Sequence, residues 1–163
     1  MKRIGTVIVF SLLAVCCYAA PSSQDDMELA RLLTIEQVDR MHGLTFEAYV
    51  CKLLESQGYA VENIRASNDY GVDAIATMGE ERIAVQIKRS KNPINRSAIS
   101  DASAGKDYYK CSKAMVVTNS RLTDNAKIFA EGIGCVTVER DDLLVWIENF
   151  KKGTKRPSSE PDE

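Results

Sequence analysis

Residues 70–89 alternate between hydrophobic and polar positions on both sides of a central Gly79-Glu80 pair. Alternation with a period of two is typical of a half-buried strand, and glycine at the first central position suits a two-residue hairpin turn. We therefore predict an antiparallel hairpin in which Ala74 lies opposite Val85. One face of this hairpin is then wholly apolar and holds these side chains: Val72, Ala74, Ala76, Ile83, Val85 and Ile87.

The opposite face of the predicted hairpin is polar. Extending the same register places Asp73 opposite Gln86 and Gly71 opposite Lys88, because side chains alternate between the two faces of a strand. A carboxylate, an amide oxygen and an ammonium group then lie close together beside a glycine that has no side chain. This arrangement predicts a site for a metal ion and a phosphate group.

The rest of the chain predicts helices alternating with strands. Thr34 to Gln37 has the pattern of a capping box, and the hydrophobic spacing that follows is helical. We expect strands at 59–64, 113–118 and 135–138. We expect one or two helical turns at 27–33 and helices at 34–43, 45–57, 97–110, 123–131 and from 141 onward, with Thr45, Thr123 and Asp141 as N-caps. Such alternation around a hairpin predicts an α/β fold with a mixed central sheet and helices on both faces.

The first residues have a different composition. Lys2-Arg3 precede an apolar run from Ile4 to Ala20, and small residues lie before Pro21. This pattern is typical of a secretory signal peptide, while the length of the run also allows an uncleaved membrane anchor. Both interpretations place the folded body outside the cytoplasm. A start further downstream is the third interpretation, and it leaves the protein in the cytoplasm.

We expect the chain to divide into four parts. Residues 1–20 form the leader, 21–33 a polar linker, 34–150 the folded domain and 151–163 a disordered tail. The chain of 163 residues is long enough for one domain with its own core, and its composition of 45% apolar and 27% charged residues is that of a globular protein.

Charge and rare residues narrow the chemistry. The formal net charge is only -2, but eight Lys or Arg residues and two Asp residues lie between Arg82 and Lys113, which makes this region basic. The only histidine, His42, argues against a zinc site built on histidines and against a Ser-His-Asp triad. The five cysteines show no CxxC spacing and do not indicate a disulfide framework.

The polar face of the hairpin has the groups needed to hydrolyse a phosphodiester. Mg²⁺ prefers oxygen ligands, which Asp73, the Gln86 amide and the Ile87 carbonyl could supply. Lys88 would hold the scissile phosphate or the attacking water, and Gly71 would leave room for the phosphate. The plainer interpretation makes Asp73 a solvated or capping carboxylate and Lys88 a charge at the edge of the sheet.

Further residues are candidates for the same chemistry. Glu47, in the second predicted helix, is either a second carboxylate for the metal or a solvated charge near the helix start. The basic loop and the helix after it would bind the nucleic-acid backbone through Arg89, Lys91 and Arg96. Asn119 and Ser120, directly after the buried strand 113–118, either contact phosphate or begin the next turn. We group Asn119 and Ser120 with the predicted nucleic-acid-binding residues.

The order of these motifs resembles the Mrr-type restriction endonuclease domain of the PD-(D/E)xK nuclease superfamily, in the variant where glutamine replaces the acidic residue of the motif. The resemblance extends from about residue 44 to residue 144. It rests on the following stretches: Phe46-Glu47, Gly58-Tyr59, Gly71-Val72-Asp73, Gln86-Ile87-Lys88-Arg89, Val116-Val117-Thr118-Asn119-Ser120 and Ala126.

The resemblance implies a three-layer α/β/α sandwich and Mg²⁺-dependent cleavage of DNA. It assigns Asp73 as the metal-binding aspartate, Gln86 as the amide of the motif and Lys88 as its lysine. It assigns Glu47 as the helix glutamate that some members use.

We therefore expect a metal-dependent DNA endonuclease with little sequence specificity, acting with Mg²⁺ or Mn²⁺. Two alternatives stay open: a catalytically inactive DNA-binding module on the same fold, and a membrane-anchored domain that binds another protein. Cleavage of both DNA strands usually requires two active sites, so a homodimer is also an expectation. Attachment to a membrane would involve residues 4–20.

Overall fold

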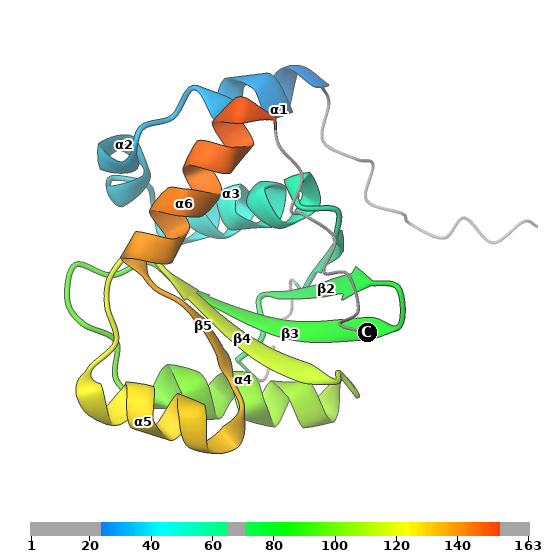
Figure 1. Ribbon diagram of the computed structural model, residues 1–163, viewed down its shortest axis with the longest axis vertical. Helices are drawn as coiled ribbons and strands as arrows, with labels where there is room; N and C mark the ends of the chain where they lie inside the picture. The colour runs from blue at the N-terminus through cyan, green and yellow to red at the C-terminus, as the bar shows by residue number, and fades with distance from the viewer. Residues whose placement is uncertain (1–23, 65–70, 154–163) are drawn as a thin grey trace, which may run out of the picture.

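The computed structural model describes residues 24–64 and 71–153 (Figure 1). These residues form six helices and five strands. The helices are α1 (Gln24–Arg31), α2 (Ile35–Asp39), α3 (Gly43–Ser56), α4 (Ser97–Tyr108), α5 (Asp124–Ile133) and α6 (Arg140–Lys152). The strands are β1 (Ala60–Asn63), β2 (Ala74–Met78), β3 (Glu81–Lys88), β4 (Lys113–Thr118) and β5 (Val136–Val138).

The strands form one mixed sheet in the order β1-β2-β3-β4-β5. The first three are antiparallel neighbours, whereas β3, β4 and β5 run parallel to one another. The parallel part follows from the two helical crossovers, since α4 connects β3 to β4 and α5 connects β4 to β5. The predicted mixed sheet is confirmed, and the last residue of β3, Lys88, pairs with Thr118 at the end of β4.

Helices cover both faces of this sheet (Figure 1). Helices α1, α2, α3 and α6 lie on one face, and α4 and α5 lie on the other. The larger core joins the first group to the sheet, with Phe46 of α3 and Phe150 of α6 fully buried. A second core beneath the sheet contains Ile99 of α4 and Val116 of β4. The three-layer α/β/α sandwich is therefore confirmed.

The central hairpin has the predicted turn and register. Gly79 has a left-handed backbone, with a φ of +58°, and Ala74 pairs with Val85. However, β2 begins only at Ala74, and Asp73 lies in a bend before it. The expected alternation therefore stops there, and Val72 packs with Ile75 and Ala84 on the opposite side from that predicted.

The predicted position of Gly71 is also wrong. Its φ is +72°, and a Cβ atom added there would lie 2.4 Å from the Asp101 Cβ and 3.0 Å from the Asp101 backbone. Gly71 therefore faces α4 in close contact and does not lie opposite Lys88 on an open face. The absence of a side chain accommodates helix packing, and the space beside it is not available to a phosphate.

Helix starts agree with the sequence only where the capping residues are unambiguous. The capping box of Thr34 and Gln37 is present at α2 as predicted. Helix α3 begins at Gly43, with His42 and not Thr45 at the N-cap. Helix α6 starts after Glu139, whose side chain and that of Asp142 form a capping box, so the predicted cap at Asp141 is two residues too late.

The folded body begins before residue 34. Residues 24–31 of the predicted linker form α1, in which Ala30 is buried in the larger core and the Arg31 guanidinium lies 5.4 Å from the centre of the Phe150 ring. The predicted leader and most of the predicted tail lie outside the described residues. Within residues 24–64 and 71–153, no helix combines the length and apolar character needed to cross a membrane.

Candidate active site

Three of the predicted site residues meet where β2 begins and β3 ends. The Asp73 carboxylate accepts hydrogen bonds at Oδ2 from the Gln86 Nε2 group, at 2.5 Å, and from the Ile87 backbone N–H, at 2.6 Å. The Asp73 backbone N–H in turn donates to the Val85 carbonyl at 2.9 Å. The bend before β2 thus brings the carboxylate over the backbone of β3, and the amide lies beside it.

Gln86 is unusual because it is a polar residue inside the sheet. It is only 2% exposed, and its Oε1 atom is buried with no hydrogen-bond partner among the described residues. A buried acceptor without a partner costs about 1–3 kcal/mol. The Asp73 carboxylate and this unsatisfied amide oxygen are ligands of the kind that a hard divalent cation prefers, so the residues present fit such a metal ion.

Glu47 lies in the first half of α3 and is half-buried. Burial raises the pKa of the nearby Cys51 thiol to about 12, and the carboxylates of Glu55, Asp73 and Glu47 add to the increase. The three carboxylates therefore all lie near enough to the Cys51 thiol to raise its pKa. Over the described part of the chain, no three His, Cys, Asp or Glu residues are grouped closely enough to hold a metal. A metal ion bound here would therefore need oxygens from Gln86 and the backbone as well as carboxylates.

Lys88 is the last residue of β3, and its side chain is exposed. The loop that follows contains Lys91 and Arg96, which are also exposed, and Arg89, which is half-buried. Arg96 borders a groove of about 660 Å³ between the first turns of α4 and α5. Its other lining residues have polar side chains, one of them acidic: Asn95, Ser97, Ser100, Asp101, Thr123 and Asn125.

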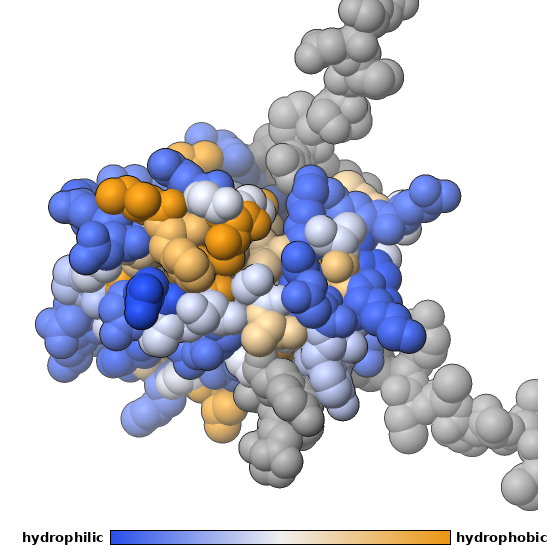
Figure 2. Space-filling model, turned by 90° about the horizontal axis from the view of Figure 1, so that it is seen from below, coloured by the Kyte–Doolittle hydropathy of each residue, from blue (hydrophilic) through white to orange (hydrophobic). Residues whose placement is uncertain are grey.

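The outer face of α4 and α5 combines this polar surface with an apolar patch (Figure 2). The patch lies on α5, where Ile128 and Ile133 are exposed and Phe129 is partly buried. The same residues form a second hollow that shares Arg96 and Asn125 with the polar groove. Cationic and amide side chains therefore lie on the surface at the start of α4, and apolar side chains lie along α5.

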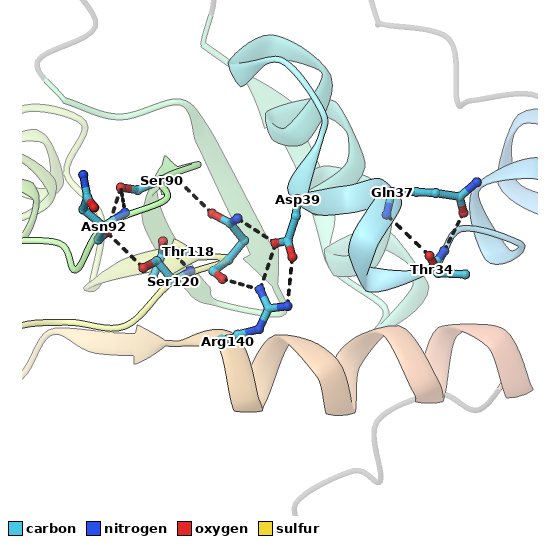
Figure 3. A network of polar contacts seen from close by, with 9 residues as sticks. Thr34, Gln37, Asp39, Ser90, Asn92, Thr118, Ser120 and Arg140 are labelled. Atoms are coloured by element: carbon cyan, nitrogen blue, oxygen red, sulfur yellow. Dashed lines mark hydrogen bonds and ion pairs between the residues drawn. The ribbon is translucent and has the colours of Figure 1, made fainter.

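Asn119 and Ser120 lie directly after β4, within hydrogen-bond reach of the basic loop (Figure 3). The Asn119 Oδ1 atom accepts from the Ser90 backbone N–H at 2.8 Å. The Ser120 hydroxyl donates to the Asn92 carbonyl at 2.9 Å. The two residues are thus brought to the same edge of the sheet as Lys88, and both contact the protein's own loop.

Two residues of this edge were not found from the sequence. Asp39, just after Val38 in α2, receives two hydrogen bonds of 2.8 Å from the guanidinium of Arg140, at the start of α6 (Figure 3). The Arg140 hydrogen bonds lower the pKa of Asp39, and Asn119 and Arg89 add to this effect. The partners are 101 residues apart in the chain, and no local pattern marks either residue as special.

The sequence of this chain is similar to those of known proteins. Residues 38–147 match a family model described as a restriction endonuclease, of the Mrr catalytic type. The chain is 30% identical over 114 residues to the type IV methyl-directed restriction enzyme EcoKMrr of Escherichia coli strain K12. That alignment covers 64% of this chain but only 38% of the relative, so the chain spans well under half of the relative's length.

Solved structures share the fold. The DNA modification-dependent restriction endonuclease AspBHI matches with a TM-score of 0.56 and 15% identity, covering 82% of this chain and 37% of that one. A protein of unknown function, AF1548, matches with a TM-score of 0.53 and 16% identity, covering 60% of this chain and 58% of that one. Because the family model spans more than half of the sequence, this chain belongs to the Mrr-type restriction endonuclease family.

Proposed function

We propose that this protein is a metal-dependent endonuclease that hydrolyses DNA phosphodiester bonds. The observation that carries the proposal is the buried, unpartnered Oε1 atom of Gln86 beside the Asp73 carboxylate, with the Lys88 ammonium on the same strand end. A cation bound by the Gln86 amide oxygen and the Asp73 carboxylate would explain why a polar amide lies inside the sheet.

The residues of the site would have different roles. Asp73, the Gln86 amide oxygen and the Ile87 carbonyl would hold Mg²⁺ or Mn²⁺, with Glu47 as a further carboxylate. When bound, the metal would supply Lewis acidity and a more acidic water. Lys88 would hold the scissile phosphate in position and stabilise the negative charge that develops on its oxygens. Binding of the amide oxygen to the metal leaves the Gln86 Nε2 group donating to Asp73, so the amide also orients the carboxylate.

DNA would lie along the strand ends and the basic loop. Arg89, Lys91 and Arg96 follow Lys88 closely and present positive charge at the same edge. Contacts between such cations and phosphates position a duplex but carry no sequence information. This arrangement supports cleavage with little sequence specificity, and it predicts DNA binding that weakens as salt is raised.

Plasmid nicking tests this function. The full chain should nick supercoiled plasmid with Mg²⁺ or Mn²⁺ and lose that activity with a chelator. We expect Asp73→Ala and Lys88→Ala each to lower the rate at least about 100-fold, because each removes a group that stabilises charge in the transition state. Lys151→Ala is the matched control, since Lys151 is exposed in the last turn of α6 and should leave nicking unchanged.

The assay also separates the alternatives. Nicking that survives both Asp73→Ala and Lys88→Ala would rule out this active site. Salt-dependent DNA binding without nicking in any divalent metal would favour an inactive DNA-binding module. The absence of both binding and nicking would favour a domain that binds another protein.

A further inference from the structure

A chain of hydrogen bonds connects α2, α6 and the ends of β3 and β4 (Figure 3). The Ser90 N–H donates to Asn119 Oδ1, and Asn119 Nδ2 donates to Asp39 Oδ1 at 2.9 Å. Arg140 holds the same carboxylate through both terminal nitrogens and also donates to the Asn119 carbonyl at 3.0 Å. Four elements of the fold thereby meet at Asn119.

The Asn119 side chain is fixed in one orientation. Asp39 accepts hydrogen bonds, so the NH₂ end of the amide must face it, and a backbone N–H requires the oxygen end. Asn119 is 5% exposed, and both ends of its amide are engaged. Because both ends of the amide are engaged and the side chain is almost wholly buried, little of it can reach a phosphate, which argues against the direct DNA contact that the sequence suggested.

Asn119 acts on a short segment that follows Lys88. Ser90 is two residues after the lysine, and its hydroxyl donates to the Asn92 carbonyl at 2.7 Å. Further along the loop, the Ile94 N–H donates to the Arg121 carbonyl at 2.7 Å. The loop is therefore anchored further along by Ile94 and by the Ser120 hydroxyl at the Asn92 carbonyl, whereas its exit from β3 is held by Asn119 through Ser90.

We propose that Asn119, locked by Asp39 and Arg140, is a positioning residue that fixes the backbone after Lys88 and so sets where the lysine ammonium and the basic loop lie relative to the reacting phosphate. The proposal rests on the proposed nuclease function. A misplacement of about 1 Å at a reacting centre lowers a rate by about 100-fold. Loss of this tether should therefore reduce the chemical step more than DNA binding.

The first test separates chemistry from binding. We expect Asn119→Ala to lower single-turnover nicking at saturating DNA about 10- to 100-fold, while the Kd for the same DNA in Ca²⁺ changes less than about threefold. Ile147→Val, in the larger core, is the control for a general loss of stability, and it should nick normally below its Tm. A Kd that rises as much as the rate falls would overturn the proposal and make Asn119 a DNA contact.

A charge exchange tests the network itself. Asn119→Asp keeps an acceptor for Ser90 but places a second carboxylate at the 2.9 Å contact with Asp39, so the two groups repel. Adding Asp39→Asn restores one amide and one carboxylate at this contact, and Arg140 keeps its hydrogen bond to the backbone carbonyl of residue 119. We expect the double variant to nick at least about fivefold faster than Asn119→Asp alone. A double variant no faster than the single one would overturn the proposal.

Hydrogen exchange gives a readout that does not depend on cleavage. In Asn119→Ala the amide of Ser90 loses its acceptor, so exchange in the peptide spanning residues 89–96 should be at least about 10-fold faster than in wild type. Unchanged exchange there would overturn the tether. A wild-type protein that nicks no DNA under any metal would overturn the nuclease function instead, and the exchange result would still decide whether the tether exists.

Discussion

At the scale of single residues, the neutral amide of Gln86 determines the charge of the site. Its oxygen contributes no negative charge, so in the proposed metal site the attraction for a divalent cation would come from Asp73 and from Glu47. Oxygen ligands of this kind suit Mg²⁺, which retains several waters and seldom needs a full protein cage.

Gly71 provides a prediction at this scale. Gly71→Ala should lower the free energy of unfolding by roughly 2–4 kcal/mol, because it adds left-handed strain and a clash with the Asp101 backbone. Gly79→Ala is the matched control: its φ is also positive, but no atom lies within 4 Å of the added Cβ, so only about 1–2 kcal/mol of strain applies. Urea unfolding of the two variants measures the difference, and equal losses would contradict the close packing on α4.

At the scale of elements, the contact between α2 and α6 holds these two helices together beside the candidate site. Helix α2 has only five residues and would not be stable alone. Its capping box fixes its start, and the paired hydrogen bonds from Arg140 to Asp39 hold its end against α6. The side chains of both residues are about one-third exposed, at 30% and 33%, so solvent weakens the ion pair without removing it.

This contact predicts how stability depends on pH. The pKa of Asp39 is lowered in the folded state from its ordinary value of 3.8, chiefly by the hydrogen bonds from Arg140. The stabilisation is therefore fully present above pH 3.8 and is lost as the pH falls through the lower folded-state pKa. Arg140→Leu should cost roughly 1–2 kcal/mol at pH 7.

Urea midpoints of wild type and Arg140→Leu at pH 7, 4 and about 2.5 measure this effect. The gap between the two proteins should be largest at pH 7 and should shrink as the pH falls below 3.8 toward the lower folded-state pKa of Asp39. A gap that stays constant over this range would show that Arg140 stabilises α2 through packing alone.

At the scale of the whole molecule, the two-sided sandwich places the site at an edge that both helical layers border. Helix α3 supplies Glu47 from one layer, and the start of α4 brings Arg96 from the other (Figure 1). The sheet between them holds Asp73, Gln86 and Lys88. A ligand that binds this edge therefore connects both layers and should stabilise the complete fold.

Metal binding should raise the Tm of the wild-type protein. At a concentration about 100 times its Kd, Mg²⁺ or Mn²⁺ adds about 2.7 kcal/mol of stability. For a chain of this size, that energy corresponds to a rise of roughly 5–10 °C. Asp73→Asn keeps the shape of the side chain but removes its charge, so its Tm should change much less, as thermal unfolding with and without metal can measure. An equal rise in Asp73→Asn would mean that the metal stabilises the protein at another site.

The amino-acid sequence by itself determined the features that depend on neighbouring residues. The alternation of polar and apolar positions fixed the register that sets Ala74 opposite Val85, and the Gly79 turn followed from local backbone geometry. The buried strand β4 and the capping box of α2 also followed from local patterns. Local chemistry is sufficient here because each feature is formed within a few residues or across one tight turn.

Only the tertiary structure decided what lies beside these elements. The close approach of Asp101 reversed the role of Gly71, and the bend at Asp73 moved Val72 to the other face of the sheet. The junction of Asp39, Asn119 and Arg140 joins residues up to 101 positions apart. Such contacts depend on how helices pack across the sheet, and packing is set by the shapes of side chains that are distant in the chain, which hydrophobic periodicity does not encode.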